Sequence, residues 1–158
     1  MRRIATACLT LTALVLAHGC AAPLPVGSAE QRERLAQLDY PQDAEVGEPL
    51  QLEVIRDGAH LRFISREPRE FRRVTLWLNQ QYAGVAERIA PGSYEAVSTN
   101  SVPLGAFINE HGEPFPVGRF LAPDDTVALV SAEMVFGEDD TTTRRALTVW
   151  PDKRWFED

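Results

Sequence analysis

The sequence predicts an all-β protein, an antiparallel immunoglobulin-like β-sandwich that follows a short helix on a flexible tether. Three observations predict this fold. After residue 46, apolar and polar residues alternate in several short segments. Turn-forming residues, mainly Gly, Pro, Asp and Asn, separate these segments. No helical period of apolar residues follows residue 40. A small β-barrel is the alternative architecture.

The clearest predicted strand pair is Leu50–Arg56 with Ala59–Ser65, because the two segments flank the dipeptide Asp57-Gly58. This dipeptide favours a two-residue hairpin loop in which both residues have positive φ. The expected pairs are Arg56 with Ala59, Ile55 with His60, Val54 with Leu61, Glu53 with Arg62 and Leu52 with Phe63. The apolar pairs then share one face, and the Glu–Arg pair lies on the other.

The remaining strands follow from the same alternation. They are expected at Arg73–Asn79, Tyr82–Ile89, Tyr94–Val97, Val102–Ile108, Thr126–Phe136 and Thr141–Trp150. Turns are expected at Pro91-Gly92, Glu110–Pro114 and Gly137–Asp140. Trp77, on a central strand, resembles the core tryptophan of immunoglobulin-like sandwiches, although the cysteine pair of antibody domains is absent.

A helix is expected over Ser28–Leu38, with Ser28 at its N-cap and Gln31 three residues later, as in a capping box. Its apolar face is thin, essentially Leu35 and Leu38, so it needs to dock on another element to be stable. The predicted organisation is a signal peptide (residues 1–19), a tether with the helix (20–45), the sandwich (46–151) and a C-terminal tail (152–158).

The first twenty residues have the pattern of an export signal. A basic start, Met1-Arg2-Arg3, precedes the uncharged segment Ile4–Ala17. That segment is too short to span a membrane, which takes about 20 apolar residues. Leu16-Ala17-His18-Gly19-Cys20 resembles the lipobox of bacterial lipoproteins, although that family usually has Leu at position 17 and a small residue at position 18.

The lipobox resemblance implies cleavage before Cys20, with diacylglycerol on its sulfur and an acyl chain such as palmitate. The alternative is an ordinary secretory signal cut near Gly19 or Ala22. Cysteine usage favours lipidation. Cys8 lies in the signal, so Cys20 is the single thiol of the mature chain, and an unpaired thiol in an oxidising compartment calls for a role.

The acidic composition bears on location and partners. Cleavage removes two arginines and no acidic residue, which leaves 14 basic against 23 acidic residues, a formal charge near −9. This charge argues against nucleic acid as a partner and against adhesion to anionic lipid. We therefore expect attachment to the membrane through the N-terminal lipid alone. The expected location is the cell envelope, at the outer membrane facing the periplasm rather than at the inner membrane.

No catalytic residue, metal ligand or cofactor is expected. His60 is predicted on the solvent face of a strand, and His111 in a polar turn. The alternative is a small envelope hydrolase or metal-dependent enzyme that uses His111 with nearby carboxylates such as Glu110 or Glu113. The acidic runs Asp124-Asp125 and Glu138–Asp140 could in principle bind calcium, but acidic residues also favour turns and keep a surface soluble.

The candidate partner-binding residues are four arginines in one short loop of this acidic protein. They are Arg66, Arg69, Arg72 and Arg73. The alternative is a solvated loop in which these side chains pair with nearby acidic residues. The expected function is a non-catalytic binding or scaffolding module of the envelope, with an envelope protein as its candidate partner. The alternative is a structural surface protein.

One further resemblance covers the domain itself. Thr75–Tyr82, Ala90–Gly92, Leu104–Phe107 and His111-Gly112 together are similar to a pattern in small exported bacterial proteins. Those proteins have no assigned role, so the resemblance implies export and no specific activity.

Overall fold

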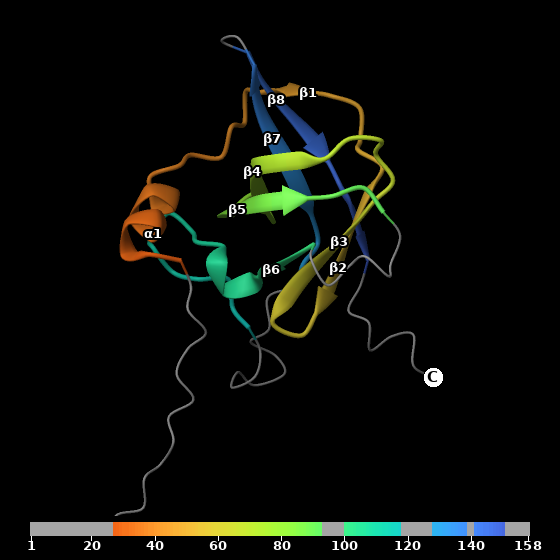
Figure 1. The fold of residues 1–158 in the computed structure, drawn as a ribbon. Helices are drawn as coiled ribbons and strands as arrows, with labels where there is room; N and C mark the ends of the chain where they lie inside the picture. Colours follow the sequence, from red (N-terminus) through yellow and green to blue (C-terminus); the bar gives the residue numbers. More distant parts are fainter. Residues whose placement is uncertain (1–26, 93–99, 118–127, 139–140, 151–158) are drawn as a thin grey trace, which may run out of the picture.

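The described part of the chain is mostly β-strand, with one short α-helix and two β-sheets (Figure 1). The computed structural model describes residues 27–92, 100–117, 128–138 and 141–150. The five-stranded sheet has the order β1 (Glu45–Val46), β8 (Thr141–Ala146), β7 (Ala132–Glu138), β4 (Phe71–Leu78) and β5 (Tyr82–Ile89). The four-stranded sheet has the order β6 (Ser101–Pro103), β3 (His60–Ser65), β2 (Leu52–Asp57) and β9 (Thr148–Trp150). The two sheets do not close into a barrel, so that alternative was wrong.

Both sheets are mixed, which corrects the expectation of a purely antiparallel fold. β1 pairs with β8 in parallel, and β2 pairs with β9 in parallel. The expected single strand Thr141–Trp150 is divided at Leu147, where the chain passes from the five-stranded to the four-stranded sheet. The segment from β1 to β2 makes the same crossing beside it. The first two strands therefore pair with the last two, β1 with β8 in one sheet and β2 with β9 in the other.

The β2–β3 hairpin forms, but its register differs by two residues from the predicted one. Asp57 pairs with His60, so the two-residue loop is Gly58-Ala59 and not Asp57-Gly58. Gly58 has φ of 58°, whereas Asp57 has no positive φ, which is the pattern of a II′ turn. A shift of two residues preserves the faces because side chains alternate with period two. Val54 consequently still faces the core, but its partner is Phe63.

Other boundaries also differ from the prediction. The strand expected at Val102–Ile108 is interrupted, because a 3₁₀ turn, η2 (Leu104–Ala106), follows β6. β7 begins at Ala132, and residues 128–131 are described but are not strand. The strand expected at Tyr94–Val97 lies outside the described residues, as do the signal peptide and the C-terminal tail.

The main hydrophobic core lies between the two sheets. Its largest fully buried side chains include Phe63, Phe107 and Phe115 together with several leucines of both sheets. Trp77 is buried too, but it points to the opposite face of the five-stranded sheet. The expectation that Trp77 is the tryptophan of the inter-sheet core was therefore wrong.

A second, smaller core explains why the N-terminal helix is ordered. The helix α1 (Ala29–Ala36) is capped by Ser28, whose hydroxyl accepts from the backbone N–H of Gln31 at 3.1 Å. Leu35 is buried against Trp77, Ala83 and Ile108, so α1 covers part of the outer face of the five-stranded sheet. Leu38 was expected on the same apolar face, but it is exposed.

Candidate functional site

The outer face of the four-stranded sheet carries an ordered row of side chains. Alternation turns these residues away from the core, which is formed by their strand neighbours such as Val54 and Leu61. The register aligns one row across all four strands: Trp150, Ile55, Arg62 and Ser101. A second row across three strands contains Thr148, Glu53 and Ile64. Apolar, cationic, anionic and aromatic groups therefore lie together on one sheet face.

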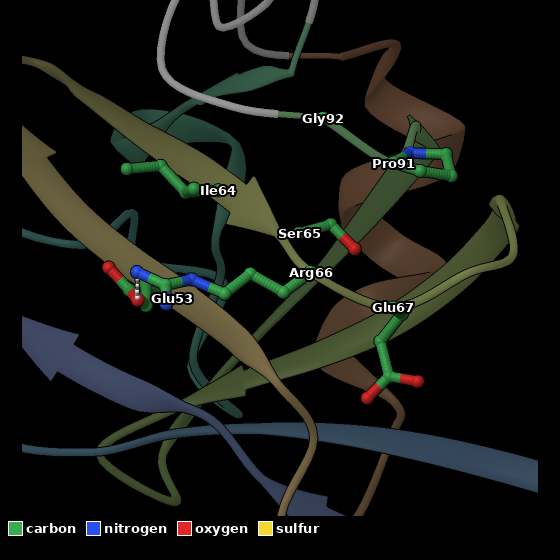
Figure 2. Close-up of a pocket in the computed structure, with 7 residues that line it drawn as sticks. All are labelled: Glu53, Ile64, Ser65, Arg66, Glu67, Pro91 and Gly92. Atoms are coloured by element: carbon green, nitrogen blue, oxygen red, sulfur yellow. Dashed lines mark ion pairs between the residues drawn. The ribbon is translucent and has the colours of Figure 1, made fainter.

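A cleft of about 510 Å³ opens at one end of this face (Figure 2). The residues that line it are Glu53, Ile64, Ser65, Arg66, Glu67, Pro91 and Gly92. Backbone hydrogen bonds fix its walls. The Gly92 N–H donates to the Ser65 carbonyl at 3.0 Å, and the Arg66 N–H donates to the Gln51 carbonyl at 2.8 Å. Glu67 accepts from the Gln51 N–H at 2.8 Å, so its carboxylate is positioned as well.

Glu53 connects the cleft with the aromatic residue beside it. One carboxylate oxygen pairs with the Arg66 guanidinium at 3.0 Å, and Figure 2 shows the Arg66 side chain extended along the cleft toward it. The other oxygen accepts from the indole N–H of Trp150 at 3.1 Å. Because both oxygens are engaged, Glu53 orients Arg66 and Trp150 at the same time.

Ser65 is a buried polar residue beside the cleft; it pairs with Leu52, so its side chain lies on the core side of β3, opposite to Glu53 and Ile64. It is only 2% exposed, and its hydroxyl has no hydrogen-bond partner within the part of the chain that the structure describes. A buried hydroxyl without a partner costs about 1–3 kcal/mol relative to a satisfied one. Such a group is uncommon in folded proteins and calls for an explanation.

The four predicted arginines do not form one surface. Arg66 lies in the cleft, whereas Arg72 pairs with Glu70 and the Arg69 guanidinium lies 5.4 Å from the centre of the Phe71 ring. Arg73 is exposed and has φ of 48°, an uncommon conformation for a residue with a side chain. The structure thus separates Arg66 from the other three and confirms pairing with a nearby acid for Arg72.

Glu70 is the centre of the remaining charge cluster. Arg72 and Arg88 are direct cross-strand partners on β4 and β5, and like charges in this position repel each other. Glu70 accepts from both guanidiniums, with Arg88 at 2.6 Å. These two hydrogen bonds, that of Arg88 first, lower the pKa of the Glu70 carboxyl from its ordinary value. The cluster is internally compensated at the surface.

The histidines are not in the cleft. The His111 imidazole lies 3.5 Å from the Glu110 carboxylate, and both side chains are more than two-thirds exposed. The turn around them is held by the side chain of Asn109, which accepts from the backbone N–H groups of His111 and Glu113. His60 lies on the outer sheet face, as expected, but opposite Asp57 rather than Ile55.

Within the described ranges, no three His, Cys, Asp or Glu side chains gather in a way that could hold a metal ion. Asp124-Asp125, Asp139-Asp140 and the predicted lipidation residue Cys20 lie outside those ranges. Among the described helices, none is long and apolar enough to cross a membrane.

A second polar group lies under the N-terminal segment. The Tyr40 hydroxyl donates to Glu133 at 2.6 Å and accepts from Arg144, and its ring packs edge-on against Trp77. Burial, and then the hydrogen bond to Glu133, raise the pKa of Tyr40 above its ordinary value. This triad fixes the residues after α1 to the five-stranded sheet, which is a structural role.

Sequence reasoning found Arg66 but missed Glu53, Ser65 and Trp150 as site residues. A signal for Trp150 was present, because it alternates with the inward-facing Val149 and so had to lie on the outer face. No protein-family model, curated protein or solved structure matches this chain.

Proposed function

We propose that this chain is a membrane-anchored envelope lipoprotein that acts as a non-catalytic binding module, with the cleft on the four-stranded sheet as its ligand site. The observation that carries the binding role is the cleft itself. A cavity with a few positioned polar groups on a rigid sheet is the usual form of a small-ligand site. Glu53 holds Arg66 and Trp150 in place before any ligand is present.

The lipid anchor rests on the sequence. Cys20 follows a basic start and an uncharged segment, and it is the single cysteine beyond the signal. Acylation at this position would hold the acidic domain at a membrane without requiring attraction to anionic lipid. The outer membrane, on its periplasmic side, is the proposed location.

The immunoglobulin-like type of sandwich belongs to the same proposal. Two packed sheets around one core support it, as does the passage of the last strand between sheets at Leu147. In such sandwiches the sheet faces and the loops at either end carry the binding sites, while the core carries stability.

The anchor is tested by fractionation and mass spectrometry of the N-terminal peptide. Cys20→Ala is expected to appear in the soluble envelope fraction or to remain as precursor, and its N-terminal peptide is expected to lack lipid. Cys8→Ala is the matched control, because residue 8 lies within the proposed signal, and it is expected to behave as wild type. Equal membrane retention of wild type and Cys20→Ala would contradict the anchor.

The binding role is tested with insoluble envelope fractions and the purified full chain carrying Cys20→Ala, so that lipid on residue 20 does not itself retain the protein. Glu53→Ala and Arg66→Ala are expected to lose retention on these fractions, because both remove parts of the cleft. Arg69→Ala is the matched control, since this arginine comes from the same loop but lies outside the cleft. Retention that falls equally in all three variants, or in none, would contradict a ligand site at the cleft.

A further inference from the structure

The charges in and beside the cleft are already compensated. Arg66 pairs with Glu53, and Arg62 pairs with Asp57 on the same sheet face. Glu67 adds one more carboxylate, so these five side chains carry three negative and two positive charges. An anionic ligand would have to displace a carboxylate from a guanidinium, which the charge balance opposes. A neutral hydroxyl can accept from a guanidinium and donate to a carboxylate without separating either pair.

Trp150 supplies an oriented apolar surface next to these polar groups. Its side chain is 41% exposed on the outer face, and the hydrogen bond to Glu53 fixes the direction of the indole. Ile55 is its cross-strand neighbour and extends the apolar surface. The face of an aromatic ring is partly negative, so it attracts the weakly positive C–H groups of an aliphatic ring laid on it. A ligand with one C–H face and a polar edge fits this arrangement.

From these two features, and resting on the proposed binding function, we infer that the cleft binds a neutral polyhydroxylated ligand, a segment of a glycan chain. One sugar ring stacks on Trp150, and the hydroxyls of the same or the next ring bond to Glu53 and Arg66.

The test measures binding of the purified full chain to defined soluble oligosaccharides by titration calorimetry. The probes are chitotetraose, maltotetraose and cellotetraose, with a heparin tetrasaccharide as the anionic comparison. At least one neutral probe is expected to bind, with an affinity that changes less than about twofold between 50 and 500 mM salt, because no net charge is neutralised. Trp150→Ala and Glu53→Ala are each expected to weaken it about tenfold or more.

Arg69→Ala is the matched control, because this arginine lies outside the cleft, and it is expected to bind the neutral probe as wild type does. Binding of the heparin probe alone, with strong salt dependence, would overturn the inference. So would neutral binding that Trp150→Ala leaves intact. If all four probes fail but a peptide library is captured in a Glu53-dependent manner, the glycan inference is wrong and the proposed binding function stands. If the peptides fail as well, both are wrong.

Discussion

Gly84 is the position at which the packing of the core can be tested most directly. It lies on β5 opposite Leu76, and a Cβ added there would lie 2.5, 2.6 and 2.9 Å from three ring atoms of Phe107. Phe107 is fully buried, so its ring has no free space into which it can move. Gly84→Ala therefore forces the ring or the strand to shift by most of an ångström.

The expected cost follows from two opposing terms. Overpacking a close-packed core costs about 1–3 kcal/mol. Replacing glycine by alanine recovers about 0.4–1 kcal/mol because the unfolded chain has less conformational freedom. The net destabilisation is then about 1–2 kcal/mol, which for a domain of this size lowers the melting temperature by roughly 3–12 °C. Urea unfolding followed by circular dichroism, and calorimetry for the melting temperature, measure both quantities.

Two controls make the Gly84 prediction specific. Gly137→Ala is the matched control, because no atom lies within 4 Å of its added Cβ, and it is expected to stay within about 0.5 kcal/mol of wild type. Phe107→Leu, which removes the clashing ring, is expected to cost less in the Gly84→Ala background than in wild type. Equal cost in both backgrounds, or a Gly84→Ala variant that melts like wild type, would refute the contact.

Three further predictions test the turns and the partly buried Tyr40. Asn79→Ala is expected to lower the free energy of unfolding in urea by about 2–3 kcal/mol, because the Asn79 side chain donates to the carbonyl of residue 128 and accepts from the N–H of residue 130, and because its φ is 51°. Asn79→Gly is expected to cost less, since glycine tolerates this φ, and a larger cost for Asn79→Gly would contradict backbone strain at this position. Gly58→Val is expected to cost about 1–3 kcal/mol through its φ of 58°, whereas Asp57→Ala, measured the same way, should cost under about 1 kcal/mol. Because the pKa of Tyr40 is raised in the folded protein, its neutral form stabilises the fold below the ordinary tyrosine pKa of 10.0, and this contribution is lost as pH rises through the higher folded pKa. The free energy of unfolding of Tyr40→Phe, measured against pH, is expected to lack this alkaline loss. Identical pH profiles of wild type and Tyr40→Phe would contradict the raised pKa.

The hairpin illustrates what the sequence could and could not define. Alternation along Leu52–Asp57 and His60–Ser65 placed every side chain on its correct face, although the predicted partners were wrong by two residues. The faces were predictable because burial has the strand's own period. The pairing register was not predictable, because two hairpin loops place the same side chains on the same faces. The observed loop, Gly58-Ala59, has a positive φ at Gly58 alone, whereas the predicted loop, Asp57-Gly58, requires a positive φ at both residues. Only the turn distinguishes the two registers.

The cleft was less predictable because its contacts are distant in sequence. Arg66 attracted attention as one of four clustered arginines, but its partner Glu53 was assigned to Arg62 in the predicted register. The hydrogen bond between Trp150 and Glu53, which are 97 positions apart in the sequence, depends on the parallel pairing of β9 with β2. Local alternation carries no information on such pairing. It indicates the face on which Trp150 lies and leaves its neighbours open.

The arginine loop shows how a backbone distortion redistributes charge. Phe71 and Val74 both face the core, although strict alternation would place them on opposite faces of β4. The positive φ at Arg73 allows this change, and two consecutive residues, Arg72 and Arg73, are exposed as a result. β5 makes the same change on the opposite strand, where Glu87 and Arg88 are both exposed between Ala86 and Ile89. The predicted strand began at Arg73, whereas β4 begins at Phe71, which is out of phase with the apolar residues that follow it. The same distortion turns Arg72 and Arg88 outward as cross-strand neighbours, and Glu70 forms ion pairs with both. Of the four arginines in the loop, only Arg66 lines the cleft.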